Sequence, residues 1–111
     1  MILRNTFASR PMSYWRAVPP GRAMQDVEAL LAGGGRALVV HGGRDYLVTD
    51  EDYGTWQRRF GGYDGIILRR YADLNHMMQP GVGRMTPAEY NQRREVSRQL
   101  LHDVADWIRA R

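Results

Sequence analysis

Two short apolar runs with a helix-sized segment between them constrain the fold of this chain more than any other feature. The first lies in a predicted strand over residues 36–41, and the second, Ile66–Leu68, lies in a predicted strand over about residues 65–71. Continuous apolar runs of this length are typical of parallel strands that are covered on both faces. Between them, Thr49 followed by Asp52 indicates a capped helix start. A strand, a helix and a strand in this order predict two parallel strands joined by a right-handed crossover.

Helical patterns lie on both sides of this unit. Apolar residues at helical spacing predict a helix over residues 22–32, which three glycines end. A last helix is predicted from Thr86 to the end of the chain, because threonine, proline and an acid begin it and an apolar face runs from Val96 to Ile108. The fold class is therefore α/β. Two parallel strands would leave both edges open, so the strand-helix-strand-helix order is expected to be the end of a larger parallel sheet, incomplete on its own.

Length and composition limit the organisation of the chain. Its 111 residues predict at most one modest domain. Residues 1–21 form an irregular segment that prolines interrupt, and residues 22–111 form the α/β subdomain. The absence of cysteine excludes disulfides and thiolate metal sites. No apolar run approaches the roughly 20 residues of a membrane span, and the first residues are too polar for a signal peptide. We expect a cytoplasmic protein with no membrane partner.

An acid and a histidine follow the two predicted strands. Gly42, Gly43 and Arg44 lead from the first strand to Asp45, and a short loop leads from the second strand to His76. In open α/β sheets, working residues lie outside the carboxyl ends of the strands. Asp45 and His76 therefore form two thirds of a hydrolytic triad, in which the carboxylate orients the imidazole and the imidazole activates a serine.

The third member of such a triad is absent from this sequence. A serine nucleophile in an α/β-hydrolase lies in a G-x-S-x-G turn. Ser9, Ser13 and Ser97 all have other neighbours, and no glycine-rich segment is present that would build an oxyanion hole. The acid precedes the histidine, as the second half of the order serine, acid, histidine requires.

Several short motifs in this order resemble the C-terminal part of an α/β-hydrolase of the dienelactone-hydrolase-like or prolyl-oligopeptidase-like branch. They lie at residues 38–49, 71–76, 86–90 and 103–108. The resemblance implies that Asp45 occupies the G-x-x-D turn after the seventh strand of such an enzyme and that His76 lies in the loop after the eighth. It also implies that the chain corresponds to roughly the last third of a hydrolase.

Other candidate sites are weaker. His41 ends the first strand and is expected to be buried with a partner, whereas His102 lies among polar helix positions and is expected to face solvent. The three histidines show no zinc-binding spacing, and no phosphate-binding glycine motif appears. We expect no cofactor and no metal.

Three functional hypotheses follow. The first is the C-terminal portion of a serine hydrolase that acts on a small-molecule ester or a peptide once a missing N-terminal part completes it; the isolated chain is expected to be inactive. The second is a stand-alone remnant that forms a homo-oligomer or binds a partner through its open strand edges. The third is an arginine-rich nucleic-acid binder, disfavoured because the sixteen arginines are scattered and not clustered.

Overall fold

A computed structural model describes residues 21–110, so most of the segment predicted to be irregular, including Ser9 and Ser13, lies outside the described residues. The described part contains two strands, three α-helices and one 3-10 helix. In chain order these are α2 (Arg22–Ala32), β1 (Ala37–Gly42), α3 (Asp50–Phe60), β2 (Ile66–Tyr71), η3 (Pro87–Asn91) and α4 (Arg98–Arg109).

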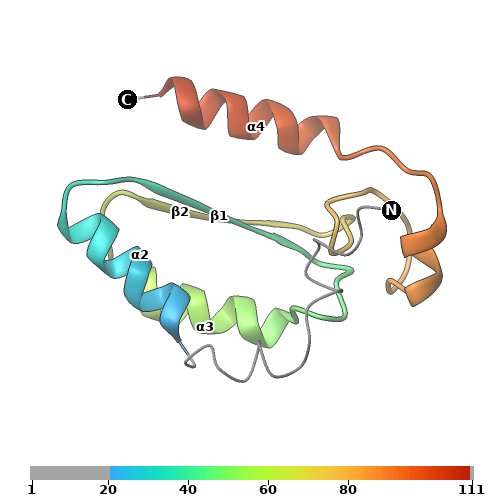
Figure 1. The fold of residues 1–111 in the computed structure, drawn as a ribbon, viewed down its shortest axis with the longest axis horizontal. Helices are drawn as coiled ribbons and strands as arrows, with labels where there is room; N and C mark the ends of the chain where they lie inside the picture. Colours follow the sequence, from blue (N-terminus) through green and yellow to red (C-terminus); the bar gives the residue numbers. More distant parts are fainter. Residues whose placement is uncertain (1–20, 111) are drawn as a thin grey trace.

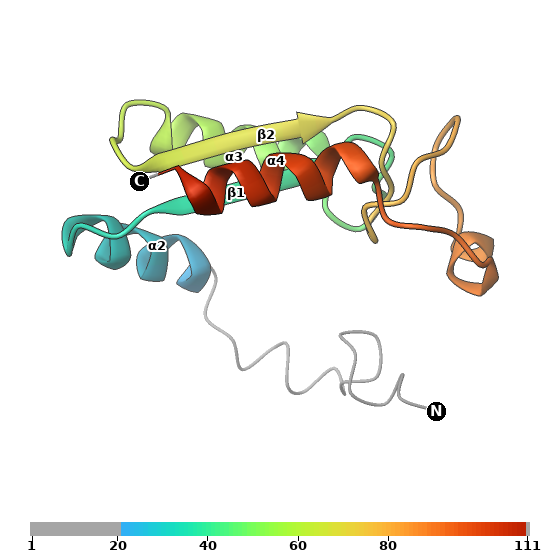
Figure 2. The same ribbon diagram turned by 90° about the horizontal axis from the view of Figure 1, so that it is seen from above.

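The two strands pair in parallel, in register from Ala37 opposite Ile66 to Gly42 opposite Tyr71. Helices α2 and α3 lie on one side of this sheet and α4 lies on the other, which gives a three-layer α/β arrangement (Figure 1, and from above in Figure 2). The predicted α/β class is confirmed. Within residues 21–110, neither strand has a second neighbour, so the sheet is an incomplete piece with two open outer edges.

Helix α3 begins where the sequence predicts. The Thr49 side chain accepts a hydrogen bond from the backbone N–H of Asp52, and the Asp52 carboxylate accepts one from the N–H of Thr49. This reciprocal cap satisfies backbone donors that the first helical turn leaves open. Tyr53 and Phe60 are buried on the inner face of the helix. The helix thus forms the crossover between the two parallel strands.

The prediction of one continuous last helix is wrong. The chain forms the short helix η3, leaves it in an extended conformation at Gln92, and begins α4 only at Arg98. The Ser97 side chain accepts a hydrogen bond from the N–H of Leu100 and acts as a second N-cap. Serine competes for backbone donors in this way, which favours helix ends over helix interiors.

Helix α4 packs on the sheet through a narrower face than predicted. Leu100 is buried, and the Asp103 carboxylate accepts a hydrogen bond of 2.6 Å from the hydroxyl of Tyr71 on β2. Val96 and Ile108, which were predicted to share the packed face, are exposed. The buried apolar residues of the described part are few: Tyr53, Phe60, Leu74, Met85 and Leu100. Within residues 21–110, no helix is both long and apolar enough to cross a bilayer.

Candidate active site

The two parallel strands have their carboxyl ends at the same edge of the sheet. Backbone hydrogen bonds join the loops that follow them. The backbone N–H of Gly43 donates to the carbonyl of Tyr71 over 2.8 Å, and the N–H of Arg44 donates to the carbonyl of Leu74 over 2.9 Å. These bonds carry the parallel pairing beyond the last strand residues. The residue after Arg44 is Asp45, and it therefore faces the loop that contains His76.

The carboxylate of Asp45 is almost fully enclosed, with 3% of its side chain exposed. One oxygen, Oδ1, accepts hydrogen bonds from the backbone N–H groups of Leu47 and Val48. The other oxygen, Oδ2, lies 2.7 Å from Nδ1 of His76. The structure thus brings the two predicted site residues together and fixes both oxygens of the acid.

The loop that presents His76 is organised by the residue before it. The Asn75 side chain is fully buried, and its Oδ1 accepts hydrogen bonds from the N–H groups of Met77 and Gln79. Met78 takes a left-handed backbone conformation with φ of 61°, which is uncommon for a residue other than glycine. The tight turn leaves 28% of the His76 side chain exposed, whereas its acid partner is buried.

This geometry suits proton transfer. A carboxylate on Nδ1 holds the imidazole in one tautomer and stabilises its cation, so proton exchange with a reacting group falls to Nε2. Histidine is suited to this task because its ordinary pKa lies near neutrality. The pair can therefore act as an acid-oriented base at the carboxyl ends of the strands.

A second buried network lies behind the pair. Glu89 of η3 accepts a hydrogen bond of 2.8 Å from Arg44 Nη2 and one of 3.1 Å from Asn75 Nδ2. Burial opposes ionisation of Glu89, but hydrogen bonds from Asn75, the Thr86 backbone and Arg44 outweigh it and hold the pKa of the carboxyl below its usual value. The predicted capping role of Glu89 is confirmed, since its carboxylate accepts a hydrogen bond from the Thr86 N–H. Its buried pairing with Arg44 and Asn75 was not predicted from the sequence.

The other histidines occupy the predicted environments. His41 is buried, stacks on the Tyr53 ring at 5.1 Å, and places Nε2 3.2 Å from the Asp50 carboxylate. The Arg70 guanidinium beside Asp50 holds the pKa of that carboxyl below its usual value. His102 is exposed on α4.

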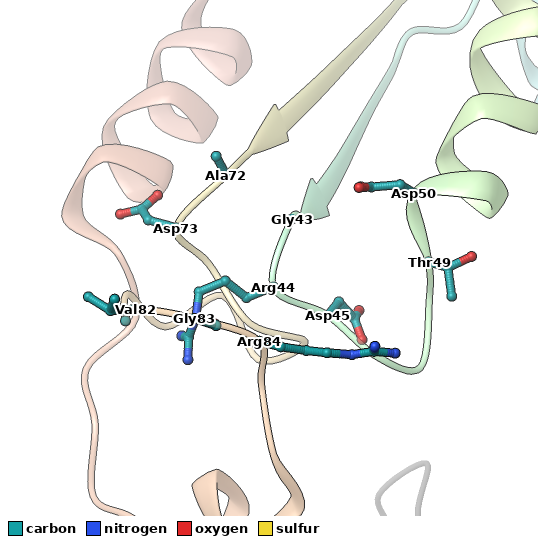
Figure 3. Close-up of a pocket in the computed structure, with 11 residues that line it drawn as sticks. Gly43, Arg44, Asp45, Thr49, Asp50, Ala72, Asp73, Val82, Gly83 and Arg84 are labelled. Carbon is teal, nitrogen blue, oxygen red and sulfur yellow. The ribbon is translucent and has the colours of Figure 1, made fainter.

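An open pocket of about 630 Å³ lies beside the acid, where the two strands end (Figure 3). Its wall includes Asp45, and charged side chains of both signs surround it. They are Arg44, Asp50, Asp73 and Arg84. No cluster of three or more potential metal-binding side chains occurs within residues 21–110. The described serine, Ser97, caps α4 through its hydroxyl.

Comparison with known proteins links the chain to an esterase. Over 71 residues, 64% of this chain, it is 35% identical to the esterase EstD of Thermotoga maritima. The match covers 17% of that enzyme, so the chain spans about a sixth of the length of this relative. No protein-family model matches the chain, and no solved structure matches it. The chain is thus a partial homologue of an esterase.

Proposed function

We propose that this chain is the C-terminal portion of a serine hydrolase, in which Asp45 is the acid and His76 the base of a catalytic triad. The observation that carries the proposal is the 2.7 Å contact between Asp45 Oδ2 and His76 Nδ1 at the carboxyl ends of two parallel strands. The partial identity to an esterase supports ester hydrolysis over peptide hydrolysis. The motifs at residues 38–49 and 71–76 favour the dienelactone-hydrolase-like or prolyl-oligopeptidase-like branch.

In the proposed reaction, a serine supplied from outside these residues attacks the carbonyl carbon of a small-molecule ester. His76 Nε2 takes the serine proton as the bond forms and returns it to the leaving alcohol, which yields an acyl-enzyme. A water molecule then repeats the sequence and releases the acid. Throughout, the buried carboxylate of Asp45 stabilises the imidazolium.

The isolated chain has no G-x-S-x-G serine, and we therefore predict that it has no serine-hydrolase turnover. Purified protein is incubated with p-nitrophenyl butyrate, and release of p-nitrophenol is compared with that from the His76→Ala chain. Equal, near-background rates are expected. A steady rate that His76→Ala abolishes would overturn this prediction.

A segment exchange tests the proposed function itself. Residues 35–111 of this chain, which include Asp45, His76 and His102, replace the C-terminal segment of the Thermotoga esterase. The chimera is expected to hydrolyse p-nitrophenyl butyrate, and His76→Ala in the transplanted segment is expected to remove the activity. His102→Ala is the matched control, because this histidine is exposed on α4.

Two outcomes would refute the proposal. One is a chimera with native-like circular dichroism and thermal melting but no ester hydrolysis. The other is a chimera in which His76→Ala leaves the rate unchanged.

A second candidate function is assembly through the sheet edges. Within residues 21–110 the outer edges of β1 and β2 are unpaired, and Ile67 on β2 is 40% exposed. Unpaired strand edges present backbone donors and acceptors to another chain. If the strand edges mediate assembly, the purified chain forms a stable homo-oligomer in sedimentation velocity. A folded monomer at every protein concentration tested would exclude this function.

A further inference from the structure

Glu89 is a buried side chain with several polar partners behind the acid and the histidine. Glu89 is only 5% exposed, although its side chain is a carboxylate. Oε2 accepts hydrogen bonds from Arg44 Nη2 at 2.8 Å and from the Thr86 N–H at 3.2 Å. Oε1 accepts one from Asn75 Nδ2 at 3.1 Å, and Arg94 Nη1 lies 3.7 Å from it. Both oxygens are therefore held.

The two side-chain donors have one property in common. Arg44 immediately precedes Asp45, and Asn75 immediately precedes His76. One carboxylate on η3 thus binds the neighbour of the acid and the neighbour of the histidine at the same time.

The two donors are tied to the backbone in different ways: Asn75 bonds the turn of its own loop, whereas Arg44 bonds the segment at residues 83–85. Asn75 Oδ1 accepts two backbone N–H groups of the turn that presents His76. On the other side, Arg44 Nε donates to the carbonyl of Gly83, and the N–H of Met85 donates to the carbonyl of Arg44. The Glu89 carboxylate is therefore linked through Asn75 to the turn that presents His76 and through Arg44 to the residue before the acid.

A contribution to the stability of the fold does not by itself explain why a charged carboxylate is buried at position 89. A buried ion pair loses hydration on folding, and apolar residues of similar volume often stabilise a fold as well or better. A carboxylate does what an apolar side chain cannot, since it accepts several hydrogen bonds in fixed directions. Catalytic pairs need such support to hold their geometry within a fraction of an ångström.

We propose that Glu89 is a positioning residue, which holds Asp45 and His76 at hydrogen-bonding distance by binding Arg44 and Asn75 together. The catalytic meaning of this inference rests on the proposed function. The claim that Glu89 maintains the Asp45–His76 contact is independent of that function. This contact lies within the 111-residue chain and is measured without substrate or nucleophile. The failure of one proposal is therefore distinguishable from the failure of the other.

Proton NMR of the full 111-residue chain provides the test. An imidazole N–H that donates to a buried carboxylate gives a far-downfield signal, which is assigned to His76 by its absence in His76→Gln. Glu89→Gln keeps the size of the side chain but removes the charge. We expect this variant to lose the His76 signal or shift it strongly upfield, while the amide signals of β1 and β2 remain dispersed.

Glu28→Gln is the matched control, because it makes the same chemical change in another ion pair. Glu28 pairs with Arg59 at 2.6 Å, away from both loops. The His76 signal is expected to stay at its position in this variant. A folded Glu89→Gln chain with an unchanged His76 signal would overturn the proposal.

A double variant keeps the test decisive if Glu89→Gln fails to fold. Arg44→Met combined with Glu89→Leu removes both buried charges and leaves apolar side chains of similar volume, which should restore folding. The positioning account expects a folded chain in which the His76 signal is still lost or displaced, because Asn75 has lost its acceptor on η3. A purely structural role for Glu89 expects the signal to return with the fold, and that result would refute the proposal.

Discussion

Gly42 packs directly against the carbonyl oxygen of Asn75, the residue before the site histidine. A Cβ added at Gly42 would lie 2.4 Å from that oxygen and 2.6 Å from the carbonyl oxygen of Leu74. Real Cβ contacts of this length essentially never occur. The last residue of β1 must therefore be glycine for the acid loop to approach the histidine loop.

We predict that Gly42→Ala destabilises the chain by about 1–3 kcal/mol, the usual cost of overpacking. The clashing atoms belong to the backbone, so no side chain can move aside to relieve the contact. Urea unfolding monitored by circular dichroism measures the change. Gly62→Ala is the control, since a Cβ there has nothing within 4 Å. Equal stability of the two variants would contradict this account of the loop contact.

We predict that Asp45→Asn in the esterase chimera lowers kcat by about 10⁴-fold, as the loss of the acid does in a serine triad. An asparagine fits the space but presents an amide to Nδ1, so the imidazole takes the wrong tautomer. Initial rates with p-nitrophenyl butyrate give kcat and KM. A large rise in KM with kcat unchanged would indicate that Asp45 supports substrate binding instead.

The alkaline stability of the chain depends on Tyr71. Burial and the hydrogen bond to Asp103 raise the pKa of this hydroxyl to about 12, from an ordinary value of 10.0. Because the folded state holds this proton more tightly than the unfolded state, the stabilisation is present below pH 10 and is lost as the pH rises towards 12. We predict that the free energy of unfolding falls between pH 9 and pH 11 and falls less in Tyr71→Phe. Urea titrations at the two pH values give both differences, and equal falls would exclude Tyr71 as the cause.

Much of the central unit could be predicted from the sequence because its local signals agree. The apolar runs gave both strands to within one residue, and the Thr49 cap gave the start of α3. The positions of Asp45 and His76 after these strands predicted that the two side chains would lie close together, because parallel strands bring their carboxyl ends to one edge.

The segment after the second strand could not be predicted in the same way. Thr86, Pro87 and Glu89 form a helix-start pattern, but the helix they begin is a single short 3-10 segment. Glu89 is turned inward to partners 45 and 14 residues away in the chain, Arg44 and Asn75. No local pattern encodes contacts of such separation. They decide the conformation because a buried carboxylate without partners would be far more costly than a broken helix.

Covalent labelling of the serine is the most direct measurement of the central claim that Asp45 and His76 serve as the acid and base of a serine hydrolase. A fluorophosphonate reacts with an activated serine, whose oxygen bonds to phosphorus as fluoride leaves and the proton passes to the base. The esterase chimera that carries residues 35–111 of this chain is treated with the probe, and the adduct is located by mass spectrometry. The account predicts rapid labelling of one serine in the chimera and almost none in its His76→Ala variant. Labelling at the same rate in both proteins would contradict it.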